Sequence, residues 1–414
     1  MTLKAISLFT GVGGLDFGFE AAGFETAVAL DIDPIACATL EKNRRWQVIK
    51  CDLAAVGSRQ ILQTAGLSVG DADVLIGGPP CQPFSKSGYW ATGDAGRLND
   101  PRADTLTQYL RVLQDTLPKT FLLENVAGLA YRGKSEGIEY IRRRISEINA
   151  HTNAQYSLEF ESLNAADFGV PQLRERVFVI GARDGARFQF PTPAYASSDR
   201  LLAEGALEPY RTAWDALGDL PTEPNDEDLK VTGKWAGLLP TIPEGRNYLW
   251  HTDRGGGAPL FGWRRRYWSF LLKLSKRLPS WTIQAQPGPA TGPFHWRNRK
   301  LSSEELGRLQ TFPKGLIYDC RRSDVQRLVG NAVPSALAEA LAREIAQQLL
   351  GRKPASGPPM LIPPRRSEPP GPEAVLTLPS KYRALIGNHK EHPGTGKGPR
   401  ANGYSSVAAQ PWPT

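Results

Sequence analysis

The sequence predicts an α/β fold in which helices cover both faces of a twisted, doubly wound and mostly parallel sheet. Two observations lead to this prediction. Short aliphatic runs alternate with segments of helical periodicity up to about residue 184, a rhythm that is typical of parallel sheets. Glycine-rich turns close two of these runs, at 11–14 and 77–78, as they do at the ligand-binding edge of such sheets.

The expected strands are short runs rich in Val, Ile, Leu and Phe. They span residues 5–9, 26–33, 48–53, 72–78 and 120–126, and two further runs, 156–163 and 176–183, are expected to add in antiparallel fashion. The expected helices span 15–24, 34–43, 102–117, about 138–148 and 334–350. Asp33 and Pro34 predict the start of the second helix, and Ser302 with Glu305 predicts a capping box.

Composition divides the chain into four parts. Residues 1–183 carry the strand–helix alternation, 184–279 are rich in Pro, Gly and aromatic residues, and 280–350 return to helical order. We expect the first and third parts to form one domain, and 184–279 to form a smaller, irregular one. Residues 351–414 are basic and hold 13 of the 34 prolines, so we expect a mostly disordered tail.

The positive charge is unevenly distributed. The chain has a formal net charge of +8, but the tail alone holds nine Lys or Arg and three Asp or Glu. Residues 246–300 carry eleven basic side chains against one acidic, with ten aromatic residues among them. This pattern is typical of nucleic-acid binding. A solvated charged surface over an aromatic core explains it equally well.

The four cysteines, Cys37, Cys51, Cys81 and Cys320, have neither zinc-site spacing nor a paired framework. We therefore expect no structural metal, no disulfides and a reducing cytoplasm. No apolar run approaches the ~20 residues that span a bilayer, and the N-terminus shows no signal-peptide pattern.

The first glycine-rich turn predicts a cofactor site. Gly11, Gly13 and Gly14 follow the first strand, but Asp16 stands where a dinucleotide fingerprint requires a third glycine. Asp31 and Asp52 end the next two strands, where Asp31 can accept hydrogen bonds from ribose and Asp52 can accept one from an adenine amino group. This combination favours a nucleoside without phosphates, such as S-adenosylmethionine. The alternative is an ordinary strand–helix turn.

The second turn places a cysteine at the same edge of the sheet. Cys81 follows the fourth strand, and Pro79, Pro80 and Pro83 restrict the backbone around it. Glu124 ends the fifth strand, so a parallel sheet brings both side chains to one edge. A nucleophilic thiol beside a carboxyl is the functional interpretation. A buried, inert cysteine is the alternative.

Six segments resemble, in their order, the motifs of the DNA cytosine-5 methyltransferases. They are SLFTGVGG (7–14), GGPPCQPFS (77–85), ENV (124–126), GVPQLRERVFVIGAR (169–183), RKLSSEELGRLQTFP (299–313) and QRLVGNAVPSAL (326–337). The resemblance implies a Rossmann-like, S-adenosylmethionine-dependent sheet, with 184–279 as a target-recognition domain. It also implies a prokaryotic enzyme that methylates C5 of cytosine in a specific duplex sequence.

The resemblance assigns roles within the site. Cys81 would add to C6 of a flipped cytosine, Glu124 would hydrogen-bond N3, and Arg174 and Arg176 would approach the base. The residues implied at the cofactor are Phe9, Gly11, Gly13, Gly14, Asp31, Ile32, Asp52, Leu53 and Asn331. Phe9 would stack near adenine, and Asn331 would bring the C-terminal segment to the first turn.

The resemblance further implies that residues 85–102, including Trp90, form a mobile active-site loop. Arg264, Arg265, Arg266, Arg297 and Arg299 are candidate DNA contacts, most simply to phosphate. We expect a monomer in the cytoplasm, associated with the nucleoid, working alone or alongside a separate restriction endonuclease.

Three alternatives compete with this interpretation. A tRNA cytosine-5 methyltransferase is disfavoured because the Cys-Phe-Thr motif of those relatives is missing from the sequence, and a catalytically inactive binding protein is disfavoured because Cys81, Glu124, Arg174 and Arg176 are all present. An NAD-dependent dehydrogenase is disfavoured by the missing third glycine. The recognition sequence cannot be predicted from these motifs.

Overall fold

A computed structural model describes most of the chain. The described residues are 2–80, 104–126, 136–204, 207–221, 223, 229–262, 268–353 and 356–387. Several residues singled out above therefore lie outside the description: Cys81, the 85–102 loop with Trp90, and Arg264 to Arg266.

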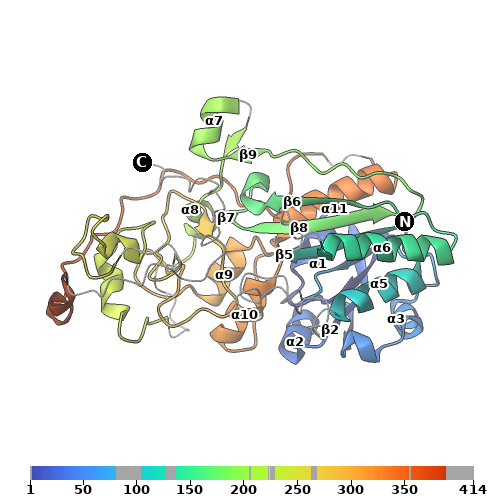
Figure 1. The fold of residues 1–414 in the computed structure, drawn as a ribbon, viewed down its shortest axis with the longest axis horizontal. Helices are drawn as coiled ribbons and strands as arrows, with labels where there is room; N and C mark the ends of the chain where they lie inside the picture. The colour runs from blue at the N-terminus through green and yellow to red at the C-terminus, as the bar shows by residue number, and fades with distance from the viewer. Residues whose placement is uncertain are drawn as a thin grey trace.

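A seven-stranded sheet forms the middle layer of the larger part of the molecule, on the right in Figure 1. Its strands are β1 (Leu3–Leu8), β2 (Phe24–Asp31), β3 (Gln47–Lys50), β4 (Val74–Gly77), β5 (Thr120–Val126), β6 (Glu159–Asn164) and β8 (Glu175–Ala182), in the order β3-β2-β1-β4-β5-β8-β6. The first five pair in parallel, and β8 and β6 add antiparallel. The strand order reverses beside β1, which is where such sheets bind ligands. The predicted α/β sheet and its antiparallel addition are confirmed.

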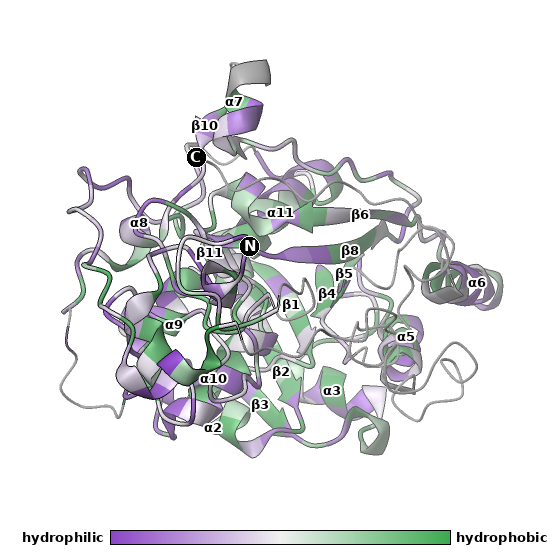
Figure 2. Cartoon of the chain, turned by 60° about the vertical axis from the view of Figure 1, so that its left-hand side comes forward, coloured by the Kyte–Doolittle hydropathy of each residue, from purple (hydrophilic) through white to green (hydrophobic). Residues whose placement is uncertain are grey.

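Helices pack on both faces of this sheet. The first core layer contains α3 (Ser58–Ala65), α5 (Asp104–Thr116) and α6 (Glu136–His151), and the second contains α1 (Gly14–Ala21) and α11 (Ser335–Leu349). Leu110 and Ile145 are buried against the first face, and Phe19 and Leu341 against the second. Figure 2 shows apolar residues concentrated in the central strands, as expected for parallel strands covered on both sides.

Two glycines allow α1 to pack closely against α11 and the segment before it. A Cβ added at Gly14 would lie 2.4 Å from the Val333 carbonyl oxygen, and one at Gly18 would lie 2.4 Å from the Ala338 Cβ. Only glycine permits this approach of α1 to α11. Ser335 Oγ donates a hydrogen bond of 2.9 Å to the Gly14 carbonyl. The segment that precedes α11 is thereby held at the first glycine turn.

The predicted caps are present. Asp33 begins α2 (Pro34–Asn43) and accepts a hydrogen bond from the Ile35 amide, and Ser302 and Glu305 form the capping box of α9 (Ser303–Leu309). Helices α3 and α10 (Arg322–Asn331) were not predicted from the sequence. Both are short and polar on most of their surface, so their apolar spacing is too brief to recognise.

Regular structure is sparse between residues 184 and 300. Among the described residues, the elements there are β9 (Tyr195–Ala196), α7 (Ser198–Glu204), β10 (Glu208–Pro209), α8 (Ala213–Leu217), the 3-10 helices η6 (Ala236–Thr241) and η7 (Tyr248–His251), and β11 (Ser280–Trp281). Strand β11 pairs with β7 (Gln172–Leu173). A second core, distinct from the two core layers that cover the sheet, forms here around Tyr248 and Phe294, each 3% exposed. Phe261 and Phe270 are partly buried against this second core. Many aromatic side chains of the basic stretch therefore form a core.

The prediction of a mostly disordered tail is wrong for residues 356–387. Leu361 and Ile362 pack against the α1–α11 core layer, and Tyr382 is 3% exposed within the second core. Arg366 donates to the Asp215 backbone oxygen. Proline-rich composition disfavours helices and strands, but it does not prevent an extended segment from binding to a surface through apolar and charged side chains.

Within the described residues, every helix is too short or too polar to traverse a lipid bilayer.

Candidate active site

A cavity of about 430 Å³ opens at the carboxyl edge of the sheet. Its wall combines the ends of β1, β2, β4, β5 and β8 with the C-terminal end of α10. Eight of the residues predicted from the sequence line it: Phe9, Gly11, Gly14, Asp31, Ile32, Glu124, Arg176 and Asn331. Parallel strands end at one edge, so the topology brings these distant residues together.

The turn after β1 is shaped by left-handed backbone. Phe9, Gly11 and Gly13 have φ of 53°, 55° and 89°. The Asp31 carboxylate accepts hydrogen bonds from the Gly11 amide at 2.6 Å and the Asp33 amide at 2.8 Å. Burial raises the pKa of Asp31, although these bonds act in the opposite direction. The turn thus holds a carboxylate against the cavity, with acceptor capacity left for a ligand's hydroxyl groups.

Three predicted cofactor residues do not line this cavity. Gly13 is the N-cap of α1, and a Cβ there would lie 3.0 Å from Leu40. Asp52 is exposed and caps a single helical turn, accepting a hydrogen bond of 2.9 Å from the Ala54 amide. Leu53 is 2% exposed and belongs to the first core layer.

A buried ion pair occupies the opposite wall. Arg176 Nε lies 2.9 Å from Glu124 Oε1, with side chains only 15% and 10% exposed. Burial raises the pKa of Glu124, while the positive charges of Arg176 and Arg174 counteract part of that rise. A Cβ at Gly78 would lie 2.9 Å from Glu124 Oε2, so glycine leaves the carboxyl its space.

The turn that leads to Cys81 is fastened to this wall. Pro79 and Pro80 line the cavity. Asn125 Nδ2 donates to the Pro79 carbonyl at 3.2 Å, and Thr105 Oγ1 donates to the Pro80 carbonyl at 3.1 Å. Sequence reasoning missed both donors. Asn125 directly follows Glu124, so its position next to a predicted catalytic residue could have identified it as part of the site.

Arg174 occupies a different position from the one expected. It is 1% exposed and does not line the cavity. Its guanidinium donates to the carbonyl of Ile283 at 3.3 Å and to that of Gly330 at 2.8 Å. The side chain therefore joins the start of β8 to the segment after β11 and to α10. Direct contact with a base, as the sequence analysis expected, is incompatible with this burial.

Asp16 is a second buried acid at the cavity. It accepts hydrogen bonds from Ser7 Oγ at 3.0 Å and from Thr26 Oγ1 at 3.1 Å. Burial raises the pKa of Asp16 to about 7, despite the hydrogen bonds, which lower it. In the sequence, Asp16 was noted only because it stands where a dinucleotide fingerprint has its third glycine. Its burial against Ser7 of β1 and Thr26 of β2 was not predicted.

Among the residues that the structure covers, no group of three or more His, Cys, Asp or Glu side chains could hold a metal ion.

The sheet order and the edge cavity define a Rossmann-like fold of the methyltransferase type. A crystal structure of an E. coli prophage protein, described as a candidate DNA modification methyltransferase, shares this fold. The TM-score is 0.59 and the identity 23%, over 85% of this chain and 100% of that one.

The profile of the C-5 cytosine-specific DNA methylases matches residues 3–347. The chain is 39% identical to the Type II methyltransferase M.SacI of Streptomyces achromogenes over 373 residues, 84% of this chain and 93% of that one. It is 33% identical to the Type II methyltransferase M.NgoFVII of Neisseria gonorrhoeae, over 83% of this chain and 86% of that one. This chain belongs to the C-5 cytosine-specific DNA methylase family, and its enzyme class is DNA (cytosine-5-)-methyltransferase.

Proposed function

We propose that this enzyme transfers a methyl group from S-adenosylmethionine to C5 of cytosine within a specific duplex DNA sequence. The reaction uses a flipped base and a transient bond between Cys81 and C6. The observation that carries this proposal is the buried Glu124–Arg176 pair, which lies in the same cavity wall as the Pro79–Pro80 turn preceding Cys81.

The cavity has the features of a nucleoside site. Its volume of about 430 Å³ is in the range of small-ligand pockets, roughly 300–1,000 Å³. Asp31 can accept from ribose hydroxyls, and Phe9 and Ile32 supply apolar surface, with Ile32 66% exposed. When bound, S-adenosylmethionine supplies an electrophilic methyl group. The Gly11 and Gly14 backbone allows close approach of such a ligand, and Asn331 lines the same cavity.

Glu124 supplies the activation that the base needs. A protonated carboxyl can donate to N3 of cytosine and so stabilise the negative charge that develops when the Cys81 thiolate adds to C6. C5 then takes the methyl group, and loss of the C5 proton expels the thiolate. Burial favours the protonated form of Glu124. Arg176 can donate to the base O2 from the same wall.

Duplex DNA is the substrate that we favour over tRNA. Curated relatives of this chain are named Type II methyltransferases, which supports a restriction-modification setting. A separate endonuclease partner, a monomeric state, and action in the cytoplasm at the nucleoid are part of this proposal. The residues between 184 and 279 would read the sequence, and those flanking them would contact the backbone.

Methyl transfer tests the substrate directly. Labelled S-adenosylmethionine is incubated with the enzyme and either unmethylated genomic DNA or tRNA, and bisulfite sequencing of the DNA locates the product. We expect 5-methylcytosine in one sequence context. Label transfer confined to tRNA would overturn the choice of DNA.

A covalent trap tests the mechanism. Duplex DNA carrying 5-fluorocytosine at the identified site should form a denaturation-resistant adduct with the wild-type enzyme when S-adenosylmethionine is present, because fluorine on the methylated C5 cannot leave as a proton does. The Cys81→Ser variant should form none. An adduct that survives this substitution would place the nucleophile elsewhere.

A further inference from the structure

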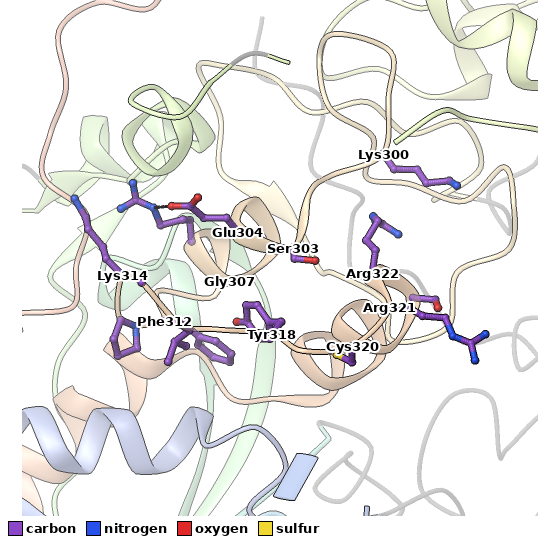
Figure 3. Close-up of a pocket in the computed structure, with 15 residues that line it drawn as sticks. Lys300, Ser303, Glu304, Gly307, Phe312, Lys314, Tyr318, Cys320, Arg321 and Arg322 are labelled. Carbon is purple, nitrogen blue, oxygen red and sulfur yellow. Dashed lines mark ion pairs between the residues drawn. The ribbon is translucent and has the colours of Figure 1, made fainter. Parts of the chain in front are cut away.

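A second hollow, separate from the cofactor cavity, is rich in positive charge. It has a volume of about 810 Å³ and lies between α9, the loop at 310–320 and the start of α10 (Figure 3). Five cationic residues line it, Lys300, Arg308, Lys314, Arg321 and Arg322, against one acidic residue, Glu304. The proposed catalytic chemistry uses none of them.

Only part of this charge is neutralised within the protein. Arg308 pairs with Asp219 at 2.7 Å and with Glu304 at 3.7 Å, and Lys314 pairs with Asp219 at 3.7 Å. For Lys300 and Arg321, no described carboxylate lies within ion-pairing distance. Figure 3 shows both at the same end of the hollow, together with Arg322.

The same end leads back to the candidate active site. Lys300, Arg322 and Ser323 also line a neighbouring hollow of about 450 Å³, whose other wall is the glycine- and proline-rich segment 285–294. Arg327 lines that hollow and also the cofactor cavity. Three hollows therefore follow one another along α10, and a cationic residue stands at each junction. At the second junction, Arg327 is already paired with Asp33 and Asp324.

This arrangement fits a chain of phosphates better than a single small anion. Arg321 and Arg327 are six residues apart on or next to α10, which corresponds to about 9 Å along the helix axis. A DNA strand presents one phosphate per roughly 3.4 Å of duplex axis, so this length faces two or three successive phosphates.

We propose that Lys300 and Arg321 form a contact site for the phosphate backbone of the DNA beside the target sequence. The site rests on the proposed function, because it requires that duplex DNA be the substrate. It extends the interface beyond the region between 184 and 279 to the residue stretches on either side of α9, with Lys300 before that helix and Arg321 at the start of α10.

Salt dependence of DNA binding tests this site. The double variant Lys300→Ala/Arg321→Ala is compared with wild type for binding to a mixed-sequence duplex several helical turns long. We expect binding about tenfold weaker at low salt, with the slope of log K against log [NaCl] shallower by about 1 to 2, since each phosphate contact contributes about 0.9. Affinity for S-adenosylmethionine, measured by calorimetry, should not change.

Two further variants complete the comparison. Arg59→Ala/Arg187→Ala removes the same charge from exposed positions on α3 and after β8, and it should keep the wild-type slope. Lys300→Arg/Arg321→Lys keeps the charge and should restore the slope. Equal slopes for the Lys300→Ala/Arg321→Ala variant and wild type would overturn the site, as would an equal loss in the Arg59/Arg187 variant.

The proposed function can fail separately from the phosphate site. Wild-type enzyme that binds duplex DNA but does not methylate it would overturn the proposed function, and the slope comparison would still decide the phosphate site. Wild-type enzyme that does not bind duplex DNA would overturn both.

Discussion

Arg176 Nε lies 2.9 Å from Glu124 Oε1 in the wall of the cofactor cavity. The arginine favours an ionised carboxylate, whereas burial disfavours it and raises the pKa of Glu124 overall. A carboxyl under these opposing influences can change protonation at little cost when a polar base enters. The pair therefore suits a residue that donates a hydrogen bond to a nitrogen of the substrate.

Glu124→Gln should abolish most of the methyl transfer without unfolding the protein. The amide keeps the shape of the side chain and one donor, but it cannot exchange a proton with the base. We expect the single-turnover rate to fall by about 10²- to 10⁴-fold, the usual range for losing a general acid. Calorimetry with S-adenosylmethionine is the control, and it should give an unchanged affinity. A variant with a near-normal rate would exclude Glu124 from the chemistry.

Gly78→Ala should displace the same carboxyl by steric contact. The new Cβ would lie 2.9 Å from Glu124 Oε2, closer than side chains tolerate, so the carboxyl must move. We expect at least a tenfold lower methyl-transfer rate with a native circular dichroism spectrum. Gly57→Ala is the matched control, because a Cβ there meets nothing within 4 Å. Equal rates for the two variants would contradict this steric account.

Arg174→Met should destabilise the fold. The buried guanidinium donates to the Ile283 and Gly330 carbonyls, and methionine leaves both acceptors without those donors. Each buried group left unsatisfied costs about 1–3 kcal/mol, so we expect a clearly lower urea midpoint. Arg187→Met, at a side chain that is 87% exposed, is the control and should keep the wild-type midpoint. A wild-type midpoint for Arg174→Met would show that the contacts contribute little.

Asp16→Asn should change the pH dependence of stability. The pKa of Asp16 is about 7 in the folded protein against 3.8 for an ordinary carboxyl. Between these values the unfolded chain releases a proton that the folded chain retains, so wild-type stability falls as pH rises from about 4 to 7. The variant has no such group. Thermal unfolding at pH 5 and pH 8 should show that the Tm of the variant, relative to wild type, is higher at pH 8. A pH-independent difference would mean that Asp16 titrates normally.

Tyr382→Ala should destabilise the second core. This tail residue is 3% exposed, and its hydroxyl donates to the Lys234 carbonyl at 2.8 Å. Removing a buried aromatic ring costs about 3–5 kcal/mol. Thermal unfolding followed by tryptophan fluorescence checks this, since Trp235 stacks on the Tyr382 ring. Arg383→Ala, an exposed neighbour, should leave the transition unchanged. If both variants unfold like wild type, residues 356–387 contribute little to stability.

Local sequence patterns were sufficient to predict the sheet and the two turns at its edge. Aliphatic runs, glycine turns and caps such as Asp33 and the Ser302–Glu305 box involve residues within a few positions of one another. Their physical causes, backbone freedom and the satisfaction of helix-end amides, act over the same short range. The motif order in turn identified the family and the residues most suited to the chemistry.

Only the tertiary structure decided which of these residues share a surface. Arg174 and Arg176 are two positions apart, yet one is buried against Ile283 and Gly330 while the other faces Glu124 in the cavity. The proline-rich tail likewise packs only because Asp215 and the second core lie where it passes. Such outcomes depend on partners far away in the chain. No local pattern encodes them, because the energy of a buried contact exists only once the sheet has brought its partners together.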